Sequence, residues 1–296
     1  MTKQLHTETK DDNLLIDTVS KYVYHNNSRQ LQHDNVIVEL PLQIRLLWTE
    51  NNQVNNKVFT ITMRTPGNDQ QLITGLLFCE GVIQTVQDID YISPDHESNN
   101  QWEVKLNNQC QPQLSSLERF QVSYSSCGLC GTTSLKSLEL KSPPHLSRKK
   151  QWLATDVIYH MPKKMRDEQL MFDQTGGVHA AALFDQHAKL IDIYEDIGRH
   201  NALDKLIGHL IATTTAPLDC SALVISSRVS FEIIQKAVMA GIPVLIAVGA
   251  PTALAIKAAK RFNLTLIGFA SAQTFNLYHG QWRLKEIPEE TKCRKT

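Results

Sequence analysis

Val244-Leu245-Ile246-Ala247-Val248 is a run of consecutive apolar residues in the C-terminal half of the chain. A strand that is apolar at every position is buried on both of its faces, as happens when helices cover both sides of a sheet. The run therefore predicts a central strand of a layered α/β fold.

The sequence around this run alternates between strand patterns and helix patterns from residue 178 onward. Such alternation is typical of a sheet with helices packed on its faces. The further strands that we predict span residues 180–184, 190–194, 222–226 and 265–269. The predicted helices span residues 201–213, 231–240 and 252–262.

A smaller part of the chain, richer in strands, precedes this region. Residues 36–48 alternate between apolar and polar side chains, which is strand periodicity. The turn-forming cluster at residues 51–57 and a second strand at 58–63 complete a hairpin. The other elements predicted here are a helix that opens at residues 65–69 and ends near Gly81, and strands at 86–92 and 102–106.

The chain is expected to divide into four regions. They are a polar flexible arm over residues 1–34, an N-terminal α+β part over 35–140, a linker or mobile loop over 141–150 and a C-terminal α/β part over 151–296. Pro143, Pro144 and a basic run mark the linker. A helix is predicted over residues 155–170, and Pro162 is expected to kink it or split it in two.

The composition excludes several classes of protein. Of the 296 residues 42% are apolar and 20% charged, and the formal net charge is zero, so no bulk field attracts nucleic acid or an anionic membrane. No apolar run approaches the ~20 residues of a membrane span, and the polar N-terminus lacks a signal-peptide core. The six cysteines follow no disulfide pattern, so we expect a cytoplasmic protein.

The most informative motif is Ser125-Ser126-Cys127-Gly128-Leu129-Cys130-Gly131-Thr132. Two thiols at this spacing can share a metal, a disulfide or a sulfur atom in transit, and the chain has no second such pair to complete a four-cysteine zinc site. Cys127 and Cys130 are therefore the candidate catalytic residues, although a structural or vestigial metal pair has the same spacing.

Polar clusters occur where predicted strands meet loops or helices. In open α/β sheets, ligands bind at the carboxyl ends of strands, where helix N-termini offer unpaired N–H groups. Arg199, His200 and Arg228 would add positive charge there, so the sequence predicts an anion pocket, most simply for phosphate. The clusters are Thr175-Gly176-Gly177-Val178-His179, Glu195-Asp196-Ile197-Gly198-Arg199-His200-Asn201, Ser226-Ser227-Arg228-Val229-Ser230 and Gly249-Ala250-Pro251-Thr252.

These residues also have purely structural interpretations. His179 taken alone is better explained as a satisfied structural histidine. Arg199 with Asp204, and Arg228 with Glu232, would be ion pairs on an exposed face. The chain has no Walker loop, no GxGxxG and no GxSxG motif, and Ser126 replaces the proline of the zinc deaminase signature. We therefore expect no resident metal.

Taken together, the motifs resemble those of the formate dehydrogenase accessory sulfurtransferase family. The resemblance covers about residue 36 to the C-terminus and implies a cytidine-deaminase-like α/β fold with a smaller N-terminal β-rich subdomain. The matching motifs are Thr65-Pro66, Glu80-Gly81, Cys127-Gly128-Leu129-Cys130-Gly131, Thr175-Gly176-Gly177-Val178-His179-Ala180-Ala181, Glu195-Asp196-Ile197-Gly198-Arg199-His200-Asn201-Ala202-Leu203-Asp204-Lys205 and Ser226-Ser227-Arg228.

The resemblance also implies a function. A cysteine desulfurase would place a persulfide sulfur on Cys127, and the protein would pass it to the molybdenum bis(molybdopterin guanine dinucleotide) cofactor, bound as a substrate, before that cofactor enters formate dehydrogenase. Alternatives are a non-catalytic cofactor-binding chaperone and a thiol-disulfide oxidoreductase. A homodimer is expected from the two guanine dinucleotide arms, and neither nucleic acid nor membrane is an expected partner. The family's cofactor stretch corresponds to Phe269, Ala270, Ser271, Ala272, Gln273 and Thr274, although some relatives carry Arg where this chain has Ser271.

Overall fold

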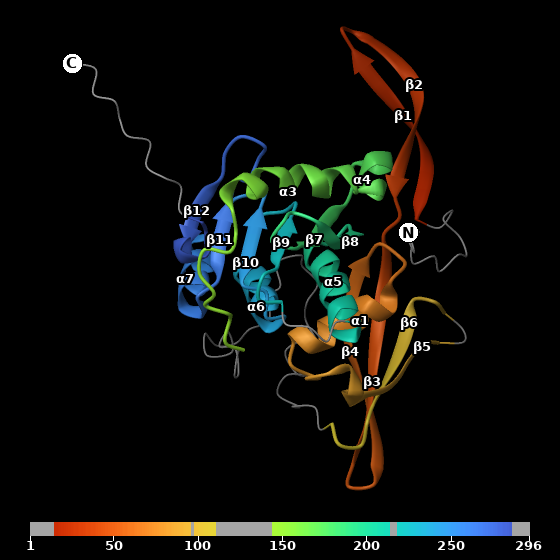
Figure 1. Cartoon of the computed structure of the whole chain (residues 1–296). Helices are drawn as coiled ribbons and strands as arrows, with labels where there is room; N and C mark the ends of the chain where they lie inside the picture. The colour runs from red at the N-terminus through yellow and green to blue at the C-terminus, as the bar shows by residue number, and fades with distance from the viewer. Residues whose placement is uncertain (1–14, 96–97, 111–143, 214–217, 286–296) are drawn as a thin grey trace, which may run out of the picture.

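The computed structural model describes residues 15–95, 98–110, 144–213 and 218–285. Within these residues the chain forms a six-stranded sheet, a four-stranded sheet and a two-stranded hairpin (Figure 1). None of the helices in the described ranges is long and apolar enough to cross a membrane.

The larger sheet has the strand order β12-β11-β10-β9-β7-β8. β9, β10 and β11 are parallel to one another, whereas β7 is antiparallel to both of its neighbours, so β8 runs in the direction of β9. The strands are β7 (His179–Phe184), β8 (Leu190–Asp196), β9 (Ala222–Ile225), β10 (Val244–Ala247), β11 (Thr265–Gly268) and β12 (Asn276–His279).

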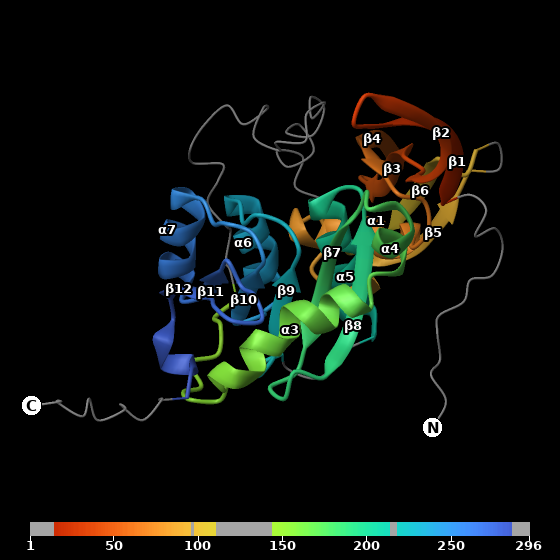
Figure 2. The ribbon, with the colours of Figure 1, turned by 90° about the horizontal axis from the view of Figure 1, so that it is seen from above.

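Helices cover both faces of this sheet (Figure 2). Along β10, Leu245 and Ala247 pack in the core beneath α5, α6 and α7, whereas Val244 and Ile246 pack in the core beneath α3. The burial on both faces that the apolar run predicts is therefore confirmed, and so is the α/β fold class. The helices are α5 (Arg199–Thr213), α6 (Phe231–Met239) and α7 (Ala253–Phe262) on one face and α3 (Thr155–Asp167) on the other.

The smaller sheet has the order β4-β3-β6-β5, and the helix α1 (Asp69–Cys79) packs on it around Phe59, Leu72 and Leu77. This is the N-terminal β-rich part that the sequence predicts. Its strands are β3 (Leu40–Glu50), β4 (Gln53–Arg64), β5 (Ile89–Pro94) and β6 (Gln101–Leu106), with a 3₁₀ turn, η2 (Val86–Asp88), before β5. The boundary predicted at residue 140 lies outside the described residues.

The two sheets are joined where α1 crosses α5 at two glycines. A Cβ atom on Gly75 would lie 1.9 Å from the carbonyl oxygen of Asp204, and one on Gly208 would lie 1.9 Å from that of Gln71. Real Cβ atoms do not approach backbone oxygens this closely, so only glycine permits this contact. The two parts of the protein are therefore packed backbone against backbone.

The flexible arm predicted for residues 1–34 is wrong from Ile16 onward. β1 (Ile16–His25) and β2 (Ser28–Ile37) pair as an antiparallel hairpin that projects from the body (Figures 1 and 2). Asn26 and Asn27, which join the strands, both have positive φ, as a tight two-residue hairpin turn requires. The polar composition concealed this hairpin because its two strands carry few buried side chains.

The split expected at Pro162 does not occur. α3 continues through the proline to Asp167, and a separate short helix, α4 (Leu170–Thr175), follows. Ile158, Met161 and Met165 bury one side of α3 in the core. This packing offsets the hydrogen bond that the proline removes.

Part of the linker predicted for residues 141–150 is held in place. Leu146 is buried in the core, and the carbonyl oxygen of Ser147 accepts two hydrogen bonds from the guanidinium of Arg283. Arg283 is fully buried at the end of the 3₁₀ turn η5 (Gln281–Arg283) and also donates to the carbonyl oxygen of Asn263 (2.8 Å). The prediction of a mobile loop is therefore wrong for the residues around Ser147.

Candidate functional site

The carboxyl ends of β8, β9, β10 and β11 lie at one edge of the larger sheet. The start of β7 lies there too, because β7 runs the opposite way. All four polar clusters found in the sequence therefore meet at this edge. We call it the strand edge and define it by residues 179, 196–200, 226–230, 248–252 and 269–274.

His179, the first residue of β7, lies at the strand edge. The N–H of Ala180 donates to the Ser226 hydroxyl oxygen (3.0 Å), and the same oxygen lies 3.4 Å from His179 Nδ1. The N–H of Ser226 donates in return to the Ala180 carbonyl oxygen (3.1 Å). This double link fixes the imidazole beside the loop that follows β9.

Gly249 brings the next two loops together. A Cβ atom here would lie 2.8 Å from both Ser227 O and Arg228 N, so any other residue would push these loops apart. The carbonyl oxygen of Gly249 also accepts from the N–H of Phe269 (3.2 Å). Arg228 and Phe269 therefore lie on either side of one glycine.

Two arginines supply the positive charge of the strand edge. Arg199 is the first residue of α5, and Arg228 is an exposed side chain in the loop before α6. Burial and the nearby charges of Arg199 and Arg228 lower the pKa of His179, whereas Asp196 opposes this shift. The histidine is therefore neutral near pH 7, and the arginines carry the charge.

His200 does not add positive charge, contrary to the sequence prediction. Burial, with Lys236 and Arg199 nearby, lowers its pKa to about 3. Its Nε2 lies 3.3 Å from Glu232 Oε2 and 3.4 Å from the Ser230 hydroxyl oxygen. No ion pair joins Arg228 and Glu232 within the described ranges, and Asp204 pairs with Lys236 (2.6 Å).

The predicted cofactor stretch, residues 269–274, forms a turn after β11. Phe269 is half-exposed, and its φ of 53° is the left-handed conformation that residues with a side chain rarely adopt. The Ser271 hydroxyl accepts from the N–H of Thr274 (3.1 Å) and closes the turn. Ala270 is buried in the core, so its side chain does not belong to the strand edge; the others are exposed.

Sequence reasoning missed some members of the strand edge. His179 was better explained as structural, yet it lies beside both arginines. Val248, which directly follows β10, is 42% exposed and is also a member. Leu254, 44% exposed at the start of α7, lies two residues beyond the defined range. Val248 directly precedes the polar cluster that starts at Gly249, and this position was the available signal for its exposure. The signal was hidden because Val248 also continues the apolar run of the strand.

Cys127 and Cys130 lie outside the described residues, as do residues 141–143 of the predicted linker or mobile loop. In the described ranges, no group of three or more His, Cys, Asp or Glu side chains is arranged to hold a metal ion. The geometry of the strand edge instead suits an anion, since helix N-termini and two guanidinium groups converge there.

Within the described ranges, the chain is an α/β protein in which a helix-covered mixed sheet is joined to a smaller sheet and carries a cationic strand edge. The FdhD/NarQ family model matches residues 49–285, most of the length, so the chain belongs to the FdhD/NarQ family. The resemblance found in the sequence is confirmed.

Individual relatives match over most of their length. A sulfur carrier protein FdhD from Sulfurisphaera tokodaii is 38% identical over 261 residues, covering 88% of this chain and 95% of that protein. One from Corynebacterium efficiens is 41% identical over 265 residues, covering 84% and 90%. The crystal structure of a candidate formate dehydrogenase accessory protein from Desulfotalea psychrophila has a TM-score of 0.70 at 22% identity, covering 91% and 99%, and shows the shared fold alone.

Proposed function

We propose that this protein is a sulfurtransferase that matures formate dehydrogenase. It accepts a sulfur atom on Cys127 and transfers it to the molybdenum bis(molybdopterin guanine dinucleotide) cofactor bound at the strand edge. Membership of the FdhD/NarQ family and relatives that carry the name sulfur carrier protein support this proposal.

One observation supports cofactor binding at the strand edge: Arg199 and Arg228 both lie near enough to His179 to lower its pKa, one at the start of α5 and the other just before α6. The guanine dinucleotide arms of the cofactor contain phosphates. Phosphates bind well to guanidinium groups and to the free N–H groups at helix starts. Thr252, whose hydroxyl accepts from the N–H of Ala255 (3.1 Å), caps the third helix that starts at this edge.

The transfer step conserves electrons and atoms. The Cys127 thiolate attacks the outer sulfur of a persulfide on the donor, a cysteine desulfurase. The S–S bond of the donor breaks, its cysteine leaves as a thiolate, and Cys127 then carries the persulfide. The soft terminal sulfur can next bind the metal of the cofactor. To release that sulfur, the Cys130 thiolate would attack the inner sulfur on Cys127: the persulfide S–S bond breaks, the outer sulfur leaves as hydrosulfide for the metal, and a Cys127–Cys130 disulfide remains for a thiol to reduce. Two cofactor arms would suit a homodimer.

Mass spectrometry tests the sulfur-accepting step. After incubation with a cysteine desulfurase and cysteine, the peptide with Cys127 should gain the mass of one sulfur, and a thiol reductant should remove it. Omitting the desulfurase is the control. A protein without any adduct would point to the cofactor-binding chaperone instead, and a bare Cys127–Cys130 disulfide that also forms without the desulfurase would point to the oxidoreductase.

Calorimetry with guanosine diphosphate, a fragment of the cofactor, tests the strand edge. Arg228→Ala should weaken binding by about 1.5–3 kcal/mol, because a charge-assisted hydrogen bond to phosphate is lost. Lys260→Ala is the matched control, since it removes an exposed positive charge from the other end of α7. Equal affinities of the wild type and Arg228→Ala would remove Arg228 from the site.

A further inference from the structure

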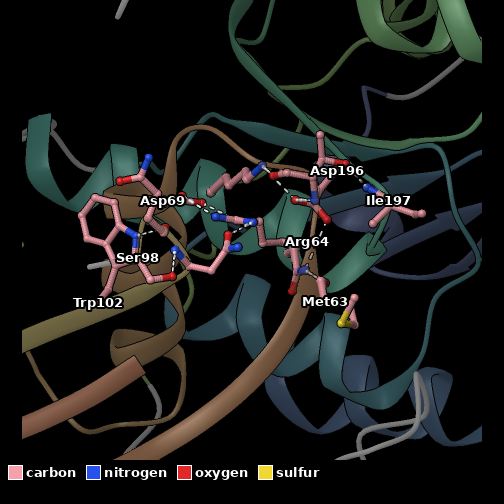
Figure 3. A network of polar contacts seen from close by, with 12 residues as sticks. Met63, Arg64, Asp69, Ser98, Trp102, Asp196 and Ile197 are labelled. Atoms are coloured by element: carbon pink, nitrogen blue, oxygen red, sulfur yellow. Dashed lines mark hydrogen bonds and ion pairs between the residues drawn. The ribbon is translucent and has the colours of Figure 1, made fainter. Parts of the chain in front are cut away.

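The three polar groups of Thr65 bind α5 and the segment that leads into it. Figure 3 shows Asp196 and Ile197 of that segment beside the end of β4. The N–H of Thr65 donates to Asp196 Oδ2 (3.2 Å), and its carbonyl oxygen accepts from Lys205 Nζ (2.9 Å). Its hydroxyl oxygen accepts from the N–H of Ile197 (3.0 Å). Thr65 directly follows β4, so the end of the smaller sheet holds the chain just before Arg199.

Asp196 is the centre of this contact. Its Oδ2 lies 2.8 Å from Lys205 Nζ, and its Oδ1 accepts from the N–H of Gly198 (2.8 Å) and from Asn201 Nδ2 (3.2 Å). Asn201 Nδ2 also donates to the carbonyl oxygen of Met63 (2.8 Å). The segment between β8 and α5 is thus held on both sides, by its own helix and by β4.

The contact leaves no room for adjustment. Thr65 and Asp196 are fully buried and Lys205 is 1% exposed, so water cannot replace a lost hydrogen bond. A Cβ atom on Gly198 would lie 2.9 Å from Asn201 Nδ2. An unpaired buried N–H is costly, so the Ile197 peptide would have to move if its acceptor were removed, and Arg199 begins two residues later.

We propose that Thr65 is a positioning residue for the strand edge: by accepting the Ile197 N–H, its hydroxyl sets where Arg199 lies beside His179. Ligand affinity at the strand edge then depends on the smaller, N-terminal part of the chain. The ligand half of this inference rests on the function proposed above, whereas the position of Arg199 can be measured without a ligand.

Four proteins test this proposal. Thr65→Val keeps the shape of the side chain and both main-chain bonds but removes the hydroxyl, and Thr65→Ser restores a hydroxyl. Thr62→Val, three positions earlier on β4, is the matched control because its half-buried side chain lies outside this contact. Wild type is the reference.

His179 is the reporter of the position of Arg199, because the charges that act on it are Arg199, Arg228 and Asp196. A cation disfavours the imidazolium, so moving Arg199 away raises the pKa of His179. NMR titration of the ligand-free proteins should show a higher His179 pKa in Thr65→Val, with Thr65→Ser and Thr62→Val like the wild type. Affinity for guanosine diphosphate should fall about 2- to 30-fold in Thr65→Val alone.

An unchanged His179 pKa in Thr65→Val would overturn the proposal. If the wild type does not bind guanosine diphosphate, the ligand proposed for the strand edge is wrong, and the titration still decides the role of Thr65. If Thr65→Val does not fold, hydrogen exchange on the wild type decides. The Ile197 amide should then exchange slowly, and fast exchange would contradict the proposed hydrogen bond.

Discussion

Cys127→Ala should abolish formate dehydrogenase maturation in cells that carry only this variant. Alanine has no sulfur to accept or release, so the persulfide has no site on the first thiol of the pair. Dehydrogenase activity of the cells is the measurement, and thermal unfolding of the purified variant should match that of the wild type. Cys130→Ala should have a less uniform effect, because solvent thiols can partly replace an auxiliary thiol.

The matched control for Cys127→Ala is Cys220→Ala. Cys220 lies just before β9, at the edge of the larger sheet opposite the strand edge, and Lys149 Nζ contacts its sulfur. Maturation should proceed normally with this variant. Normal dehydrogenase activity with Cys127→Ala would end the assignment of the persulfide to Cys127.

Gly75→Ala should lower the free energy of unfolding strongly. The added methyl would lie 1.9 Å from the carbonyl oxygen of Asp204, so α1 and α5 must separate. Overpacking of this kind costs about 3 kcal/mol or more, which exceeds the roughly 1 kcal/mol that alanine gains over glycine within a helix. The net loss is about 2 kcal/mol or more, and at about 2–4 °C per kcal/mol thermal unfolding should occur at least about 4 °C lower.

Gly208→Ala supplies the reciprocal test, because its methyl would meet the carbonyl oxygen of Gln71 on α1. The double variant should cost less than the sum of the two, since the first methyl already parts the helices. Gln70→Ala, on the exposed side of α1, is the control and should shift stability by no more than about 0.5 kcal/mol. An unfolding temperature of Gly75→Ala equal to that of wild type would contradict the packing described here.

The larger sheet could be predicted from the sequence because its central strands are apolar at every position. The hairpin of β1 and β2 was missed for the opposite reason. Its strands bury few side chains, so their sequences show no clear alternation of apolar and polar residues. A local signal did exist. Asn26-Asn27 and Asn51-Asn52 form the same kind of turn, with positive φ at both residues. Only Asn51-Asn52 lay between two segments whose sequence pattern predicts strands.

The strand edge could be predicted because the carboxyl ends of parallel strands meet at one edge. The protonation state of its side chains could not be predicted from the sequence. His200 belongs to a basic cluster in the sequence, but burial beside Lys236 keeps it neutral, and burial depends on packing between α5 and α6. The role of Thr65 was also invisible, because its partners are more than a hundred residues away in the chain.

Phe269 lowers the stability of the fold at the place where we propose that a ligand binds. Its left-handed backbone costs about 1–3 kcal/mol, and that cost is present whether or not anything occupies the strand edge. The free energy of unfolding is therefore lower than it would be with a glycine at this position. The ligand that we propose for the strand edge would meet a half-exposed aromatic ring whose backbone is already ordered, so its affinity would not be reduced by an ordering step.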